Sequence, residues 1–212
     1  MADSVVVIEK VSLRYKKTVL TDVNITAGKG EVIGLLGLNG SGKSTLLTAI
    51  AGLRKPASGT IKVNGKAGFV TQENALIDEL TAIDNLKMWI PLSRQEILKE
   101  LTETELSILK VADFIDLKVK RMSGGMKKRL ALASVLISKP DVLLMDEPLA
   151  SLDIPAKNDI IRFIDSFRNK GGTVFVASHN DELFRHCTRI YLLKNGVSSL
   201  LPAGASPAEA LE

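Results

Sequence analysis

A glycine-rich segment near residue 40 most constrains what this chain can fold into. It reads Gly-Leu-Asn-Gly-Ser-Gly-Lys-Ser-Thr over residues 37–45 and fits the pattern G-x-x-x-x-G-K-[ST]. The largely apolar residues 31–36 precede it, and residues 43–51 have helical character, so we expect a strand, a phosphate-binding loop and a helix. Glycines allow the tight turn that directs successive backbone N–H groups at phosphate oxygens, and the helix N-terminus favours an anion there.

The side chains of this segment have predicted tasks. Lys43 can reach the β- and γ-phosphates of a nucleoside triphosphate, and the hydroxyl of Ser44 can bind Mg²⁺. The predicted nucleotide-binding residues of the segment are Gly37, Asn39, Gly40, Ser41, Gly42, Lys43, Ser44 and Thr45.

A second segment, residues 142–148, reads Val-Leu-Leu-Met-Asp-Glu-Pro. Its four apolar residues predict a buried strand that ends in two carboxylates, at the sheet edge where open α/β sheets bind their ligands. Asp146 suits a magnesium site. Glu147 would then lie beside the γ-phosphate, where it can orient or deprotonate water.

Composition narrows the class of protein. The chain has 212 residues, 45% hydrophobic and 25% charged, which fits one globular domain, or one domain with an inserted lobe, and excludes a disordered chain. The single cysteine, Cys187, and two histidines exclude an internal disulfide and a structural zinc site. The net charge is +4, and we interpret the basic clusters at residues 118–121 and 127–129 as solvated surface rather than a nucleic-acid interface.

The order of predicted elements favours an α/β fold with a mostly parallel sheet. Strands at residues 5–13 and 19–25 precede the glycine loop and suggest an antiparallel flap. A helical stretch from about residue 73 to residue 137 interrupts the pattern, with a helix predicted over residues 93–109 that begins at a capping box of Ser93 and Glu96.

A third segment, residues 122–129, reads Met-Ser-Gly-Gly-Met-Lys-Lys-Arg and resembles the signature sequence of ABC-transporter ATPases. A serine and two glycines at the start of a helix form a second anion site. The family usually has leucine and glutamine where this chain has Met122 and Met126. Met126 leaves the contacts of Ser123 and the backbone possible but removes a polar side chain.

Four further positions resemble the family in the same order. Tyr15 is similar to the aromatic residue that stacks on adenine, and Gln72 to the glutamine at the border of the helical lobe. The sequence Ala-Ser-Leu-Asp, ending at Asp153, is similar to the loop that contacts the partner subunit. His179 ends a predicted strand and is similar to the switch histidine of the family.

The resemblance implies the ABC ATPase fold. It divides a single domain into a P-loop NTPase (RecA-like) core of residues 1–72 and 138–200 with the β flap, a helical subdomain of about residues 73–137, and a tail of residues 201–212. It also implies a head-to-tail homodimer, or a pair with a related ATPase subunit, in which ATP lies between one glycine loop and the other subunit's signature. The implied signature contacts are Ser123, Gly124 and Gly125.

The resemblance also implies roles for individual residues. Lys43, Gln72, Glu147 and His179 form the implied catalytic set, with Glu147 as the general base. His179 would contact the γ-phosphate. The implied Mg²⁺ ligands are Ser44, Gln72 and Asp146, and the implied cofactors are ATP and Mg²⁺.

The implied function is ATP hydrolysis that drives transport through separate transmembrane permease subunits. We predict no transmembrane helix, no signal peptide and no nucleic-acid partner, and so a cytoplasmic protein held peripherally on the inner face of the membrane by those permeases. The alternative is a soluble ABC ATPase without a transport role. The few residues after Gly196 leave no room for the regulatory domain that some importers add, which favours an exporter or a system of unassigned direction. Neither the cargo nor the direction of transport is predicted.

Apolar residues after Gln72 suggest where a membrane partner binds. Leu76, Ile77, Met88 and Trp89 are difficult to bury together in a lobe of about 65 residues. We predict that parts of residues 75–77 and 88–89 line a groove for a cytoplasmic helix of a transmembrane subunit.

Overall fold

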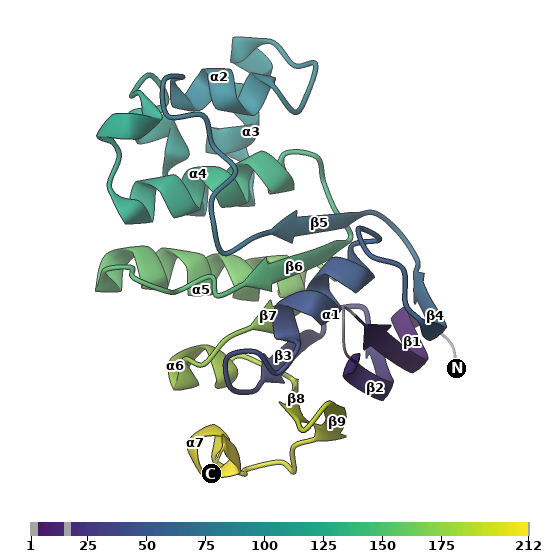
Figure 1. Cartoon of the computed structure of the whole chain (residues 1–212). Helices are drawn as coiled ribbons and strands as arrows, with labels where there is room; N and C mark the ends of the chain where they lie inside the picture. The colour runs from purple at the N-terminus through teal and green to yellow at the C-terminus, as the bar shows by residue number, and fades with distance from the viewer. Residues whose placement is uncertain (1–3, 15–17, 212) are drawn as a thin grey trace.

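The computed structural model describes residues 4–14 and 18–211. Figure 1 shows a central sheet with a smaller sheet near the N-terminus on one side, and several helices gathered at the opposite end from the C-terminus. The predicted α/β class with a mostly parallel sheet is confirmed.

The central sheet has six strands among the described residues. Five of these strands, β3 and β5–β8, pair with their neighbours in parallel, and β9 runs antiparallel to β8. In spatial order the strands are β5 (Ala67–Val70), β6 (Val142–Asp146), β7 (Thr173–Ala177), β3 (Val32–Leu36), β8 (Arg189–Lys194) and β9 (Val197–Leu200).

Both faces of this sheet are buried, and β7 shows how. Val174 and Val176 pack in a core that continues into the helical end, whereas Phe175 and Ala177 pack in a core shared with the smaller sheet. Successive side chains of a strand point to opposite faces, so an entirely apolar strand requires cover on both sides. Short runs such as residues 142–145 are therefore apolar throughout rather than alternating.

The smaller sheet is antiparallel and is formed by β2 (Thr18–Gly28), β1 (Ser4–Arg14) and β4 (Ser58–Val63). The two strands predicted before the glycine loop are confirmed, and β4 completes the sheet. Helix α1 (Lys43–Ile50) packs against β6, β7 and β4, so the helix that follows the glycine loop lies between the two sheets.

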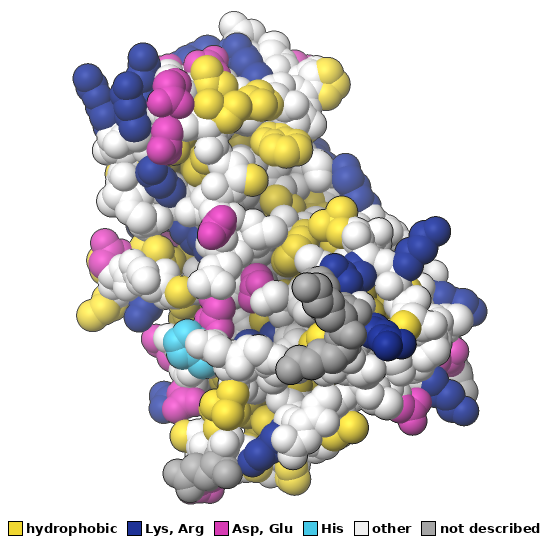
Figure 2. All heavy atoms as spheres, in the orientation of Figure 1, with side chains coloured by type: hydrophobic (Ala, Val, Ile, Leu, Met, Phe, Trp, Pro, Cys, Tyr) yellow, Lys and Arg dark blue, Asp and Glu magenta, His cyan; other side chains and the backbone are white. Residues whose placement is uncertain are grey.

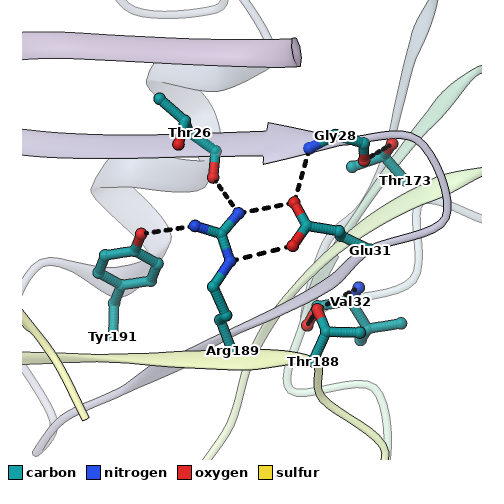
Figure 3. Close-up of polar contacts among 8 residues, drawn as sticks. All are labelled: Thr26, Gly28, Glu31, Val32, Thr173, Thr188, Arg189 and Tyr191. Atoms are coloured by element: carbon teal, nitrogen blue, oxygen red, sulfur yellow. Dashed lines mark hydrogen bonds and ion pairs between the residues drawn. The ribbon is translucent and has the colours of Figure 1, made fainter. Parts of the chain in front are cut away.

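A polar network fixes the smaller sheet to the central sheet (Figure 3). Arg189, at the start of β8, donates from Nε and Nη2 to the two carboxylate oxygens of Glu31, over 3.0 and 2.6 Å. Its Nη2 also donates to the carbonyl of Thr26 in β2 over 2.6 Å, and Nη1 lies 3.3 Å from the hydroxyl of Tyr191. Because Glu31 accepts from the backbone N–H of Gly28, the bidentate pair fixes the turn that leads into β3 and the glycine loop.

The helical end is formed by residues between β5 and β6. Its elements are α2 (Ala82–Lys87), α3 (Arg94–Glu103), the 3₁₀ helices η1 (Glu105–Leu109), η2 (Val111–Phe114) and η3 (Val119–Arg121), and α4 (Gly124–Leu136).

One predicted helix is shorter than expected. The capping box of Ser93 and Glu96 is confirmed, but α3 ends at Glu103, and the prediction of a helix to residue 109 is wrong. Thr104 is extended, with φ −115° and ψ −177°, and its hydroxyl accepts from the N–H of Leu106 to begin η1. A threonine side chain competes for backbone groups in this way at helix ends.

The remaining helices follow β6, β7 and β9. They are α5 (Ile154–Asn169), α6 (Asp181–Phe184) and α7 (Pro207–Leu211). Within the described ranges, no helix combines the length and the apolar character that crossing a lipid bilayer requires.

Candidate functional site

The glycine loop leaves the end of β3 and turns directly into α1. Gly40 and Gly42 have φ values of 83° and 104°, in the left-handed region that favours glycine, and Gly42 is the N-cap of α1. The turn places Lys43 at the first helical position. The ammonium of Lys43 donates to the carbonyls of Gly37 and Leu38, over 2.6 and 3.2 Å.

The Lys43 ammonium is nearly enclosed, with 7% of the residue exposed. Burial lowers the pKa of Lys43, and the nearby carboxylates of Glu147 and Asp146 oppose that shift. A cation held only by carbonyls of its own loop can exchange them for phosphate oxygens, which are stronger acceptors for a charged donor.

The two carboxylates lie where β6 ends, as the sequence predicted. Asp146 is the last residue of β6, and both it and Glu147 are buried. Glu147 has a φ of 45°, an uncommon conformation for a residue with a side chain, and its N–H donates to the carbonyl of Ala177 over 2.9 Å. The neighbouring strand β7 therefore fixes the direction in which the chain leaves β6.

Residues that follow β7 contact the Glu147 carboxylate. His179 Nδ1 lies 2.9 Å from Glu147 Oε1, and the Ser178 hydroxyl donates to Glu147 Oε2 over 3.3 Å. The Ser178 hydroxyl also accepts from the N–H of Asn180 over 3.0 Å, which fixes its orientation. Sequence reasoning missed Ser178; its position beside His179 at the end of a buried strand was the signal that could have identified it.

A cavity of about 250 Å³ lies between the glycine loop and the carboxylates of Asp146 and Glu147. Gly37, Ser41 and His179 are not part of its lining, and Val19 is a lining residue that the sequence did not predict. The residues around the cavity are Val19, Asn39, Gly40, Gly42, Lys43, Ser44, Thr45, Gln72, Asp146 and Glu147.

The signature residues lie outside this cavity. Ser123 and Gly124 are exposed at the start of α4, where the Ser123 hydroxyl accepts from the N–H of Met126 over 3.2 Å. Gly125 is buried, and a Cβ at this position would lie 2.9 Å from the Cβ of Ala156 in α5. Close packing of α4 on α5 thus requires glycine there, while the first two signature residues face solvent.

Two other predicted site residues have different outcomes. Asp153 is exposed and caps α5, its Oδ1 accepting from the N–H of Ala156 over 2.9 Å. Tyr15 lies outside the described residues.

The basic cluster at residues 127–129 is not the solvated surface that we expected from the sequence. Lys128 is 5% exposed, and its ammonium donates to the carbonyls of Thr71 and Gln72 over 3.0 and 3.3 Å. On α4, Lys128 lies three residues after Gly125 and four before Leu132, which are both buried, so helical spacing was the signal for its burial.

The donors around the cavity suit a hard cation only together with a ligand. In the described part of the chain, no group of three or more His, Cys, Asp or Glu side chains is arranged to hold a metal ion. The cavity instead offers the Ser44 hydroxyl, the Gln72 amide and the Asp146 carboxylate. Such oxygen donors match Mg²⁺ when phosphate and water supply the remaining ligands.

Comparisons with known proteins agree with this geometry. The ABC transporter family matches residues 20–150. The lipoprotein-releasing system ATP-binding protein LolD of Rickettsia typhi is 32% identical over 94% of this chain and 100% of its own length. Among solved structures, an ATP-binding subunit of an ABC transporter has a TM-score of 0.86 at 25% identity, with 97% of each chain covered.

A second solved structure adds a chemical state. The ATP-binding cassette MJ0796, described as a dimer in a post-hydrolysis state with bound ADP and Pi, has a TM-score of 0.81 at 29% identity and covers 93% of this chain and 99% of its own. The chain belongs to the ABC transporter family and is one of its ATP-binding subunits, which hydrolyse ATP to drive transport.

Proposed function

We propose that this ATPase works as a head-to-tail homodimer, or paired with a related ATPase subunit. The observation that carries the proposal is the separation of two anion-binding elements on one chain. Lys43 and the glycine loop line the phosphate cavity, whereas Ser123 and Gly124 face solvent elsewhere, at the start of α4. A second subunit that presents its own Ser123 and Gly124 would complete the site, and the dimeric relative MJ0796 supports this arrangement.

We infer that Ser44, Gln72 and Asp146 hold Mg²⁺ together with ATP. Their hydroxyl, amide and carboxylate oxygens line one cavity and are the donor types that this ion prefers. Bound Mg²⁺ would offset charge on the phosphates during transfer.

The other predicted site residues have proposed tasks of their own. Lys43 exchanges the carbonyls of Gly37 and Leu38 for phosphate oxygens of ATP. Glu147 accepts a proton from the attacking water, and His179 keeps the Glu147 carboxylate in place and contacts the γ-phosphate. Tyr15 stacks on the adenine, and Asp153 lies at the contact with the partner subunit.

We propose that hydrolysis reaches a membrane partner through the helical end, residues 73–137. A groove of about 400 Å³ runs from the segment around Gln72 to α4 and Trp89. Thr71, Glu73 and Asn74 line one wall, and Ala131 and Val135 of α4 line another.

Apolar exposure supports this groove as the docking site for a cytoplasmic helix of a transmembrane subunit. Ile77, Met88 and Trp89 are 42, 54 and 58% exposed, and Figure 2 shows hydrophobic side chains on the surface of the helical end. Of the segments predicted to line the groove, Ala75 and Trp89 do so, whereas Leu76, Ile77 and Met88 lie outside its lining. Leu76 differs from our expectation because it is partly buried against the core. Asn74 also lines the groove, and its Oδ1 atom is buried without a hydrogen-bond partner in the described part of the chain.

The proposed location follows from these partners. We propose that the subunit lies in the cytoplasm, on the inner face of the cell membrane, and is held there by separate permease subunits. The transport role of the relatives supports this assignment over an ABC ATPase without a transport role.

The test of the dimer is the variant Glu147→Gln. The amide keeps the shape of the side chain but cannot act as a base, so ATP should bind and be hydrolysed at least ~10²-fold more slowly. Light scattering should then detect a dimer in Mg-ATP and a monomer in Mg-ADP or without nucleotide. A variant that remains monomeric in Mg-ATP at high protein concentration contradicts the proposal.

A further inference from the structure

Lys128 is a buried cation outside the phosphate cavity. It lies on the face of α4 that packs into the protein, and its ammonium donates to two consecutive carbonyls, those of Thr71 and Gln72. Lysine is rarely buried unless its charge has partners. The ammonium therefore cross-links the signature helix to the main chain of the residue whose side chain lines the cavity.

The neighbours of Lys128 join the same helix to other segments. Lys127 Nζ lies 2.9 Å from Oδ1 of Asp78, in the segment between Gln72 and α2. Arg129 Nη1 lies 3.3 Å from Oδ2 of Asp159 in α5. Three successive basic side chains thus tie α4 to three separate parts of the chain, and Lys128 makes the connection at Gln72.

The surroundings of the Lys128 ammonium also relate it to the site. Burial lowers the pKa of Lys128, and the carboxylates of Asp146 and Glu147 oppose this shift, so the ammonium lies within the electrostatic influence of both. Both residues that supply the accepting carbonyls, Thr71 and Gln72, are exposed, so without Lys128 water can hydrate this segment and let it move.

We propose that Lys128 is a positioning residue for ATP hydrolysis. Its ammonium holds the main chain of Gln72 against α4, the helix that begins at the signature residues. The side chain of Gln72 then enters the cavity at a fixed distance from Ser123 and Gly124 of the same chain. Closure of the dimer on ATP therefore moves the signature and Gln72 together. The inference rests on the proposed role of Gln72 as a Mg²⁺ ligand.

The test compares Lys128→Met with Gln72→Ala and with the double variant, all in the full chain with Mg-ATP. Lys128→Met keeps the length and apolar stem of the side chain but loses the donors. We expect kcat to fall about tenfold and KM for ATP to change less than about threefold, because Lys128 does not line the nucleotide cavity. In the Gln72→Ala background, Lys128→Met should cause almost no further loss of kcat, because Lys128 acts by positioning the side chain of Gln72.

Controls separate this role from a general loss of stability. Lys99→Met removes an exposed ammonium from α3 in the same helical end and should leave kcat unchanged. Lys128→Gln retains N–H donors on a shorter side chain and should have an intermediate kcat, which keeps the test valid if Lys128→Met folds poorly.

Two outcomes overturn different statements. Independent losses that multiply in the double variant, or an unchanged kcat in folded Lys128→Met and Lys128→Gln, overturn the positioning role of Lys128. A Gln72→Ala variant that hydrolyses ATP at the wild-type rate overturns the proposed role of Gln72 itself.

Discussion

His179 and Glu147 come from neighbouring strands and meet at the ends of both, with His179 Nδ1 2.9 Å from Glu147 Oε1. Glu147 follows β6 and His179 follows β7, and these two strands pair in parallel with Asp146 opposite Ala177. The imidazole is 67% exposed, whereas the carboxylate is buried. The exposed imidazole therefore has surface free for a further contact while the ring holds the carboxylate.

This pair predicts the effect of His179→Ala. Without the imidazole, the Glu147 carboxylate keeps only its weaker contact with Ser178, so we expect kcat for ATP hydrolysis to fall about 10²-fold. The Kd for ATP should rise by less than about tenfold, because one hydrogen bond to the γ-phosphate is lost. In a Glu147→Gln background the same substitution should add little, and steady-state kinetics of the four proteins checks this. Full additivity of the two losses would show that the residues act separately.

Lys43→Ala should weaken ATP binding. A charged donor contributes about 1.5–3 kcal/mol to a hydrogen bond with an anion, so the Kd should rise by roughly 10- to 100-fold. Titration with a fluorescent ATP analogue measures this change. Lys55→Ala, which removes an exposed lysine, is the matched control. Equal affinity of the Lys43 variant and the control would exclude the assigned phosphate contact.

Cys187 should react slowly in the folded protein. Burial raises the pKa of its thiol to about 12, so very little of the nucleophilic thiolate is present at pH 8. We expect the reaction with a disulfide reagent at pH 8 to be at least ~10-fold slower in the native protein than in denaturant. The chain has one cysteine, so complete reaction releases one molecule of the reagent's coloured thiolate per protein molecule. Equal rates of reaction in the native protein and in denaturant would contradict the raised pKa of the Cys187 thiol.

Local sequence was sufficient to predict the two ends of the cavity. The glycine loop and the pair Asp146 and Glu147 each follow a buried apolar strand, and the parallel sheet brings both strand ends to one edge. Such features depend on residues adjacent in the chain. Their motifs were therefore sufficient to predict where Lys43, Ser44 and Glu147 lie, without knowledge of the fold.

Other features depended on hydrogen bonds that patterns of residue spacing do not specify. Thr104 ends α3 because its hydroxyl bonds to the backbone, a choice that helical spacing alone does not reveal. Helical spacing places Lys128 on a buried face, but the carbonyls that accept from its ammonium, those of Thr71 and Gln72, lie more than 50 residues away in the chain. Ser178 likewise acquires its contact from another strand.

The last prediction concerns the proposed docking groove. Leu76 packs partly against the core, so the variant Leu76→Asp would also disturb the fold. Ala75 is exposed and lines the groove, which makes Ala75→Asp the cleaner change. It should leave ATP binding intact and reduce both association with permease subunits and ATP-driven transport. Ala208→Asp, on the exposed surface of α7, is the matched control.

Trp89 is the single tryptophan of the chain, and it lines the groove. Its fluorescence emission should therefore shift to shorter wavelength when a permease helix binds the wild-type protein, and should not shift in Ala75→Asp. Transport at the wild-type level by Ala75→Asp would place the permease contact on another surface.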